Sequence, residues 1–259
     1  MSEWLAVICL GIIEGITEFL PISSTGHLLL AEHWLSRQSD LFNTLIQTGA
    51  VLAVALIFTG RLRQLLFRWR EPESRDCLLK LVTAFVITGA GGLLLKRAGL
   101  KLPETVAPVA IATLIGGVLF LVVEQWLRNR PMRDEITWII AAAVGIAQLV
   151  AAVFPGTSRS GITILVALAF GVSRPAAAEF SFLLGIPTLI SAGALQTVSA
   201  LRHPTSESIH WDMILLGSIV AAVTAFAVVK WLLRFIQTHT FVGFAWYRIG
   251  LGIVILVFL

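Results

Sequence analysis

Long apolar runs constrain the fold of this chain more than any other feature of its sequence. Six runs reach the length of about 20 residues that a helix needs to cross a hydrocarbon core; they lie at about 41–60, 77–96, 106–127, 178–199, 212–233 and 241–259. A charged content of only 13% and a mean hydropathy of +0.90 exclude an ordinary soluble domain. We therefore expect an all-α polytopic membrane protein with six full transmembrane helices, forming one integral membrane domain over residues 1–259.

Two further apolar regions, 4–35 and 136–173, are each interrupted near the middle by a proline and small hydroxyl residues. The interruptions read PISS at 21–24 and PGTS at 155–158. Non-helical backbone is tolerated at membrane depth only where protein buries it or where it lines a wet cavity. Each region is therefore predicted to form a re-entrant helical hairpin, and the two breaks are predicted to meet in the interior, where a site would be built.

The two broken regions resemble each other when the chain is shifted by 134 residues. Four of fourteen positions are then identical: Gly11, Ile12, Pro21 and Ser24 match Gly145, Ile146, Pro155 and Ser158. Each broken region precedes three full spans, an odd number, so the second copy must enter the membrane from the opposite face. This predicts an inverted-topology repeat, with repeat 1 at about 1–130 and repeat 2 at about 136–259, and with a site at the broken helices.

The distribution of Lys and Arg predicts the orientation in the membrane. Ten arginines fall in one set of loops: Arg61, Arg63, Arg68, Arg70, Arg75, Arg128, Arg130, Arg133, Arg174 and Arg234. Five basic residues fall in the other set: Arg37, Lys96, Arg97, Lys101 and Arg202. The richer set is expected in the cytoplasm, so both termini and the mouth of the first hairpin are expected to face outward. A net charge of +4 in such loops favours contact with anionic lipid over a nucleic-acid surface.

The first break carries two acidic residues within EGITEFLPISSTGH, residues 14–27. Glu14 and Glu18 are four residues apart and therefore stack on one face of a helix. An acidic residue at mid-helix costs about 2.5–3.5 kcal/mol on insertion scales, and such residues are functional by default. The pair is expected to hold a divalent cation, or one member to accept a proton, beside the hydroxyls and His27. The alternative is a shallow helix end at which both carboxylates are hydrated.

The second break carries the opposite charge. Its sequence PGTSRSGIT, residues 155–163, places Arg159 between two serines at the start of a helix. Free backbone N–H groups, hydroxyls and a guanidinium together favour a tetrahedral oxyanion such as phosphate. The alternative is that Arg159 snorkels to an interface while the hydroxyls cap the helix. Because the two breaks occupy equivalent positions, the cationic and acidic groups are predicted to face each other.

These motifs resemble those of the undecaprenyl diphosphate phosphatases, also called bacitracin resistance proteins. The likeness lies in ExxxE followed by FLPxSSTGH over Glu14–His27, in PGTSRSGxT over Pro155–Thr163, and in AEFSFLLGIP at 178–187 and AWYR at 245–248. The resemblance implies hydrolysis of undecaprenyl diphosphate to its monophosphate at the outer face of the bacterial inner membrane. This reaction recycles the lipid carrier for peptidoglycan synthesis, and the resemblance also implies a divalent cation, Mg or Ca. One departure is that the stretch 82–92 lacks a proline, which leaves open a paralogue with altered lipid preference.

Carried onto matching positions, the resemblance assigns catalytic roles to Glu14, Glu18, Ser24, His27 and Arg159. The acidic pair would bind the metal or activate a nucleophile, and either Ser24 or His27 would attack the distal phosphorus, with His27 also able to serve as the base for Ser24. Phosphate-binding side chains are expected at Ser23, Thr25, Ser158, Ser160, Thr163 and Arg248. Arg248 has a second interpretation, as the partner of Glu179.

A transporter is the main alternative, because inverted repeats with broken helices are typical of transporters. Such a protein would move or flip a lipid phosphate or another anion. Two carboxylates beside an anion argue against a pure anion carrier unless a metal or proton couples transport, and the serine and histidine cluster favours chemistry. The expected partners are the lipid substrate and membrane lipids, with no nucleic acid; the oligomeric state, including a homo-oligomer, stays open.

Overall fold

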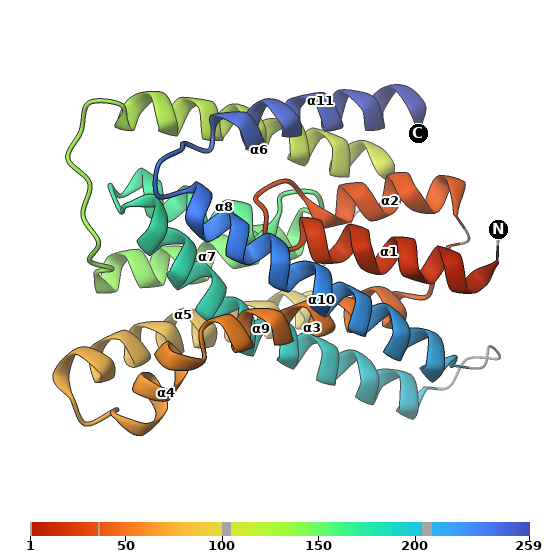
Figure 1. Ribbon diagram of the computed structural model, residues 1–259, viewed down its shortest axis with the longest axis horizontal. Coiled ribbons are helices and arrows are strands. Elements are labelled where there is room, and N and C mark those ends of the chain that lie inside the picture. Colours follow the sequence, from red (N-terminus) through yellow and green to blue (C-terminus); the bar gives the residue numbers. More distant parts are fainter. Residues whose placement is uncertain (1, 36, 100–104, 204–208) are drawn as a thin grey trace.

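A computed structural model describes residues 2–35, 37–99, 105–203 and 209–259 of the chain. Over these residues the chain forms eleven helices (Figure 1). They are α1 (Glu3–Thr17), α2 (Ser24–Trp34), α3 (Asp40–Ile57), α4 (Thr59–Phe67), α5 (Pro72–Arg97), α6 (Val106–Leu127), α7 (Trp138–Val153), α8 (Arg159–Ala169), α9 (Arg174–Arg202), α10 (Trp211–Phe235) and α11 (Val242–Phe258). The all-α prediction is thus confirmed for the part of the chain that the structure describes.

Five of the described helices are long and apolar enough to cross a membrane: α3, α5, α6, α9 and α10. Their outer faces expose large apolar side chains such as Leu94, Val122 and Val223, which suits a hydrocarbon solvent rather than water. The protein is therefore an integral membrane protein. The run at 241–259 forms α11, which has 17 residues, so the sixth full span stays a prediction.

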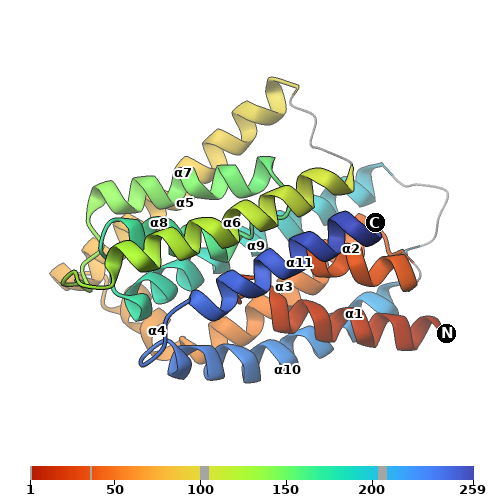
Figure 2. The same cartoon turned by 90° about the horizontal axis from the view of Figure 1, so that it is seen from above.

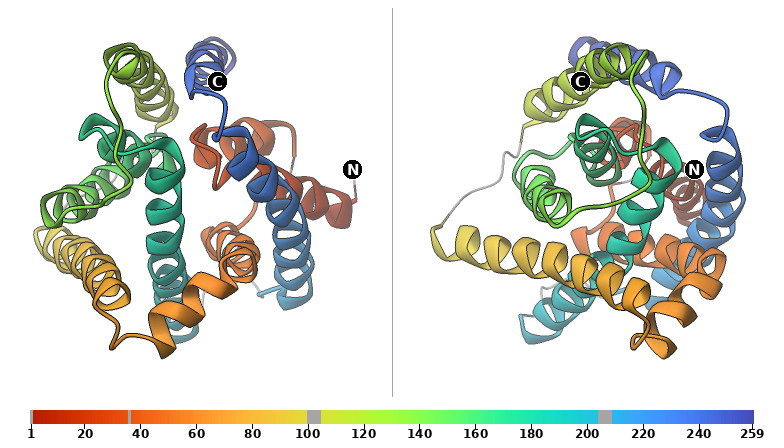
Figure 3. Two further views of the ribbon diagram at one scale, coloured as in Figure 1. Left: turned by 60° about the vertical axis from the view of Figure 1, so that its left-hand side comes forward. Right: turned by 90° about the vertical axis from the view of Figure 1, so that its left-hand side faces the viewer.

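The two broken apolar regions form two helical hairpins. Helices α1 and α2 enter from the end of the bundle that holds the N-terminus, α7 and α8 enter from the other end, and the tips of the two hairpins meet near the middle (Figures 1 and 2). The helices are interrupted over residues 18–23 and 154–158, where the sequence predicts the breaks. Seen along the long axis, α8 occupies the centre of the bundle (Figure 3), and Ile164 and Leu168 are fully buried there.

Each break ends in a serine with a left-handed backbone conformation. Ser23 has φ 75° and Ser158 has φ 69°, a conformation that costs of order 1–3 kcal/mol for a residue other than glycine. The side chain of each serine accepts a hydrogen bond from the backbone N–H three residues later, Gly26 at 3.2 Å and Gly161 at 3.1 Å. Each serine therefore caps the short helix that follows it.

The two cap serines correct the alignment of the two broken regions. Ser23 and Ser158 are 135 residues apart, not 134. Ser24 therefore corresponds to Arg159, the first residue of α8, rather than to Ser158. The two breaks also differ in length, since residues 18–23 separate α1 from α2 but only residues 154–158 separate α7 from α8.

The two ends of the bundle differ in charge. Both termini lie at one end in Figure 1, whereas α4, the connection from α6 to α7 and the connection from α8 to α9 lie at the other. The loops with ten arginines all belong to this second end. In the poorer set, Lys101 falls outside the described residues. The predicted grouping of the loops into two sets agrees with the arrangement of the helices.

A buried carboxylate joins three segments at the arginine-rich end. Glu124 of α6 has a side chain that is only 1% exposed. It accepts hydrogen bonds from Nε of Arg174 at 2.9 Å, from Nη2 of the same guanidinium, and from the backbone N–H of Phe241 at 2.8 Å. Because Arg174 begins α9 and Phe241 precedes α11, Glu124 holds the starts of these two helices against the end of α6.

Replacing Glu124 with alanine is expected to lower the free energy of unfolding by about 3 kcal/mol, because the Arg174 guanidinium and the Phe241 N–H lose their acceptor. Thermal unfolding of the purified protein in a single detergent measures the change. Glu71→Ala is the matched control, since the pair of Glu71 with Arg68 is more than half exposed and such pairs contribute about 0–1 kcal/mol. Equal shifts in the two variants would contradict the role of Glu124.

Candidate active site

An ion pair joins the two breaks in the interior of the bundle. Nη2 of Arg159 donates to Oε1 of Glu18 at 2.9 Å, and the two side chains are only 12% and 7% exposed. Glu18 follows directly after α1 and Arg159 begins α8, so each group lies at the tip of its own hairpin. The acidic and cationic groups of the two breaks thus face each other, as the sequence predicts.

The same carboxylate also contacts the first hydroxyl of α2. Oγ of Ser24 donates to Oε2 of Glu18 at 2.8 Å. The break between the helices turns the chain back so that these side chains, six residues apart, meet. Glu18 therefore links Ser24 to Arg159, with one carboxylate oxygen for each. Among the described residues Ser24 hydrogen-bonds Glu18 and not His27, which differs from the serine–histidine pairing considered from the sequence.

Arg159 keeps part of its hydrogen-bonding capacity free. Its Nη1 donates to the backbone oxygen of Ser181 at 3.4 Å, and the guanidinium lies 5.5 Å from the centroid of the Phe19 ring. Its Nε is buried and has no hydrogen-bond partner among the described residues. Gly185 makes room for the side chain, because a Cβ there would lie 2.3 Å from Nη1. The site therefore offers a buried cationic donor to an anion.

Glu14 lies one helical turn before Glu18 and has a different environment. Its side chain is fully buried, and neither carboxylate oxygen accepts a hydrogen bond from a described donor. The carboxyl group of Glu18 is close enough to interact with it. The free oxygens of Glu14 suit a cation with oxygen ligands. Each oxygen of Glu18 accepts one hydrogen bond, from Ser24 or Arg159, and keeps a further lone pair beside Glu14, so the residues present fit the predicted divalent cation.

The remaining predicted hydroxyls have structural contacts of three kinds or are exposed. Oγ of Ser160 shares its proton between the backbone oxygens of Glu18 at 3.0 Å and Leu20 at 3.1 Å. Oγ1 of Thr163 bonds Oγ of Ser181 at 2.6 Å. Thr25 is exposed, and the side chains of Ser23 and Ser158 cap their helices. A direct contact of these five hydroxyls with phosphate stays a prediction.

His27 is held between the backbone of the first break and the last helix. Its Nδ1 lies 2.7 Å from the backbone oxygen of Ser23, and its Nε2 lies 2.7 Å from the hydroxyl of Tyr247. The two rings stack with an interplanar angle of 6°. Because a carbonyl can only accept, Nδ1 carries the proton, and Nε2 accepts from Tyr247 when the imidazole is neutral.

Arg248 of α11 binds the backbone of both breaks. The side chain is fully buried. Its guanidinium donates to five backbone oxygens, those of Pro21, Ala112, Thr113, Gly156 and Thr157, at 2.9–3.4 Å. Gly116 allows this approach, since a Cβ there would lie 2.1 Å from Nη2. Arg248 therefore positions the two breaks relative to each other.

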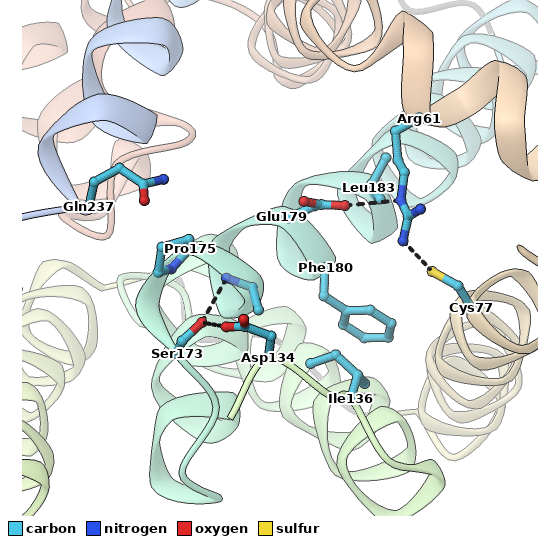
Figure 4. A pocket seen from close by; sticks show the side chains of 11 residues that line it. Arg61, Cys77, Asp134, Ile136, Ser173, Pro175, Glu179, Phe180, Leu183 and Gln237 are labelled. Carbon is cyan, nitrogen blue, oxygen red and sulfur yellow. Dashed lines mark hydrogen bonds and ion pairs between the residues drawn. The ribbon is translucent and has the colours of Figure 1, made fainter. Parts of the chain in front are cut away.

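The expected pairing of Arg248 with Glu179 is wrong. Glu179 instead pairs with Nε of Arg61 at 3.1 Å (Figure 4). Both residues line a separate cavity of about 510 Å³ near the arginine-rich end, where Arg61 also contacts Cys77. The reason is helix phase: Glu179 faces this cavity from α9, whereas Ser181 on the same helix faces Arg159. Glu179 has no contact with the ion pair of the two breaks.

Sequence reasoning missed four residues of the site: Phe19, Ser181, Gly185 and Tyr247. All four stand inside the recognised motifs, but each acts through a contact that only the fold creates. Tyr247 had the clearest signal, because it is the chain's single tyrosine and directly precedes Arg248 in AWYR. Ser181 and Gly185 had none, since small residues in a membrane helix are ordinarily packing residues.

Comparison with known proteins gives a consistent result over the whole chain. Residues 7–254 match the model of a family described as bacitracin resistance protein BacA. A protein of Rhizobium etli named undecaprenyl-diphosphatase is 49% identical over 255 residues, which is 98% of this chain and 96% of that protein. Proteins of the same name from Xylella fastidiosa and Xanthomonas oryzae are 48% and 49% identical over 260 residues, covering 100% of this chain and 100% and 98% of theirs.

Replacing Arg248 with methionine is expected to destabilise the protein by about 3 kcal/mol, because buried carbonyls in both breaks lose a charged donor. Thermal unfolding gives the size of the effect, and amide hydrogen exchange at 18–26 and 154–161 should rise more than in the long helices. Arg234→Met is the control, since Arg234 is exposed at the end of α10. Unchanged exchange in both breaks would contradict the positioning role.

Proposed function

The chain belongs to the bacitracin resistance protein BacA family, and we infer that it hydrolyses undecaprenyl diphosphate to undecaprenyl phosphate and inorganic phosphate. It is a membrane phosphatase that recycles the lipid carrier of peptidoglycan synthesis, and the family name connects it with bacitracin resistance. The observation that supports this chemistry best is the link from Ser24 through Glu18 to Arg159, which combines a nucleophile, a base and a phosphate-binding cation.

We assign Ser24 as the nucleophile. Glu18 already accepts the hydrogen bond of its Oγ at 2.8 Å and would take the proton as Oγ attacks the distal phosphorus. The bond between that phosphorus and the bridging oxygen breaks, and undecaprenyl phosphate leaves with the electron pair. Water then attacks the phosphoserine, which releases inorganic phosphate and restores Ser24. Arg159 would stabilise the transferring phosphoryl group through its unpartnered Nε.

His27 suits the second step better than the first. Its Nε2 is the nitrogen that any attack on phosphorus would require, and the Tyr247 hydroxyl holds this nitrogen at 2.7 Å. Ser24 has its base in place, whereas a nucleophilic His27 would first have to lose Tyr247. We therefore propose that His27 accepts the proton of the water that hydrolyses the phosphoserine. Its Nε2 would have to release Tyr247 for this step as well, but only after Tyr247 has kept the imidazole oriented through the first step, for which Ser24 already has a base.

A divalent cation, Mg or Ca, is proposed at Glu14 and Glu18. With both carboxylates ionised, the charges of Glu14 and Glu18 are balanced by those of Arg159 and the nearby Arg248, and a diphosphate adds negative charge, so a cation would offset the charge of the substrate. The described residues hold no group of three His, Cys, Asp or Glu side chains that could bind a metal, so substrate oxygens would complete its coordination, as is usual for Mg²⁺. When bound, the cation neutralises charge on the phosphates.

We propose the bacterial inner membrane as the location, with the site open to the periplasmic or outer face. The support is the separation of charge along the bundle: the arginine-rich connections gather at the end opposite the two termini (Figure 1). Basic loops favour the cytoplasmic side. The first hairpin enters from the end of the termini, so its mouth would face outward.

An inverted repeat of the two halves is proposed from the packing of the helices. Helix α1 packs on α10, and its counterpart α7 packs on α5; likewise α2 contacts α11 while α8 contacts α6. The pairs α3 with α9 and α6 with α11 join equivalent helices of the two halves. Exchanging the halves thus reproduces this set of contacts, as a two-fold axis in the membrane plane requires.

Glu18→Gln and Arg159→Ala are each expected to lower kcat by about 10²–10³, the effect of losing one strong electrostatic contact in a transition state. Ser24→Ala is expected to lower kcat further, because it removes the nucleophile itself. The measurement is phosphate release from undecaprenyl diphosphate, with each divalent cation and with a chelator. The double variant of Glu18 and Arg159 should be little worse than the worse single variant, because groups acting as one unit are not additive. The control is Arg61→Ala, which removes an arginine paired with a glutamate in the other cavity.

Two outcomes would contradict this assignment. Additive losses in the double variant would mean that Glu18 and Arg159 do not share one transition state. No phosphate release by folded wild-type protein with any divalent cation would favour the transporter, whose two broken hairpins would then move the lipid phosphate without hydrolysing it.

The orientation predicts a labelling pattern. In a background without Cys9 and Cys77, cysteine at position 202 is expected to react with an impermeant maleimide added outside intact cells, whereas cysteine at position 68 reacts only after lysis. Both Arg68 and Arg202 are exposed, so burial does not decide the difference. The reverse pattern would invert the topology and move the site to the cytoplasmic face.

A further inference from the structure

An apolar groove lies along α6, outside the site described above. Its volume is about 470 Å³, and it is bounded by α6, the end of α7 and α8; Figure 3 shows α6 beside α8 in both views. Its walls include Ile111, Ile115 and Leu119 on one side and Phe154, Ile162 and Leu165 on the other. We call this the α6–α8 groove.

The α6–α8 groove opens towards the bilayer. Ile111 and Ile115 are 49% and 53% exposed, and Phe154 is 51% exposed, although all three line it. The outer faces of α6 and α7 carry further exposed apolar side chains, which face hydrocarbon in a membrane protein. A lipid chain can therefore enter the α6–α8 groove sideways from the bilayer without crossing water.

The inner end of the α6–α8 groove reaches the loop that carries Arg159. Thr157 and Arg248 are its lining residues with polar side chains, and Gly161 lies beside them. Thr157 and Gly161 flank the segment 158–160, and Nη2 of Arg248 donates to the backbone oxygen of Thr157 at 2.9 Å. The apolar walls thus end against the backbone of the candidate phosphate site.

We propose that the α6–α8 groove binds the prenyl chain of the diphosphate substrate. The inference rests on the proposed function, in which the phosphates lie at Arg159. Such a ligand is polar at the diphosphate and purely apolar along its chain. The protein presents polar groups at the 158–160 loop and apolar walls along the groove, in the same order. The contact of the groove with Thr157 and Gly161, on either side of the loop that carries Arg159, is the reason to place the substrate's own chain here rather than an acyl chain of a bilayer lipid.

A second groove continues the first and can take a longer chain. It has a volume of about 490 Å³, lies between α5 and α7, and shares Val150 and Phe154 with the α6–α8 groove. Gly91 of α5 forms part of its wall. A longer chain would therefore extend past Phe154 along this wall.

Ile115→Trp is expected to raise KM for undecaprenyl diphosphate about tenfold with little change in kcat, because the indole takes up space in which several carbon atoms of the chain would be buried. KM for farnesyl diphosphate should rise less, since a shorter chain loses less burial. Val118→Trp is the matched control: Val118 is 45% exposed on α6 and does not line the groove. Ile162→Trp tests the opposite wall if the first variant folds poorly.

The outcomes separate this inference from the proposed function. If the wild-type protein releases phosphate but Ile115→Trp and Val118→Trp have the same KM, the proposed role of the groove is wrong and the proposed function stands. Wild-type protein that releases no phosphate from either substrate would contradict the proposed function instead. A loss in kcat that is equal for both chain lengths would also overturn the groove, because it would place the effect at the phosphates.

A labelling experiment tests the α6–α8 groove without catalysis. In a background lacking Cys9 and Cys77, the methylene diphosphonate analogue of undecaprenyl diphosphate should slow reaction of Ile162→Cys with a membrane-permeant maleimide at least about fivefold, an effect of direct occupancy. Val118→Cys should be unaffected. Equal protection by phosphatidylglycerol would show that bilayer lipid, and not the substrate chain, occupies the groove.

Discussion

The ion pair between Glu18 and Arg159 is the contact on which the arrangement of the site depends, because it joins two hairpins that enter from opposite ends of the bundle. A buried ion pair adds little net stability, since desolvation of the two charges offsets most of their attraction. The ion pair instead fixes the position of the two hairpin tips relative to each other. Glu18 can bond Ser24 with one oxygen and Arg159 with the other only when both tips reach the same place. The proposed nucleophile, base and phosphate-binding cation are therefore brought together by tertiary contact.

Broken backbone inside a membrane protein creates carbonyl and N–H groups that need partners, because lipid offers none. Arg248 lies on the distant helix α11, and its guanidinium donates hydrogen bonds to five backbone oxygens of the two breaks and α6. Arginine suits the task, since its planar guanidinium carries five donors and stays charged. Ser160 adds bonds to two more carbonyls of the first break. A rigid pair of breaks is the physical condition for holding Ser24 against Glu18.

Glu14 and Glu18 show how two identical side chains on one helix face acquire different roles. Both oxygens of Glu18 are engaged by donors, which keeps this carboxylate oriented towards Ser24 and Arg159. The oxygens of Glu14 have no donor at all among the described residues. A carboxylate with that environment is suited to a cation, and one with ordered donors is suited to moving a proton at a defined atom. Within the proposed site, Glu14 is thus the better cation ligand, and Glu18 is the carboxylate placed to take the proton of Ser24.

The sequence by itself determined the class of fold, the position of both breaks and the family, because apolar length, proline and small hydroxyl residues act locally through the solvent and the backbone. It also predicted one site with Glu14, Glu18, Ser24, His27 and Arg159, since motif and charge both indicate it. Only the tertiary structure decided which of them touch: Ser24 bonds Glu18, His27 bonds Tyr247, and Arg248 binds backbone rather than Glu179. The reason is that hydrogen bonds between helices depend on register and rotation, which local signals do not set: the aligned motifs pair Ser24 with Ser158, whereas the cap geometry pairs Ser23 with Ser158.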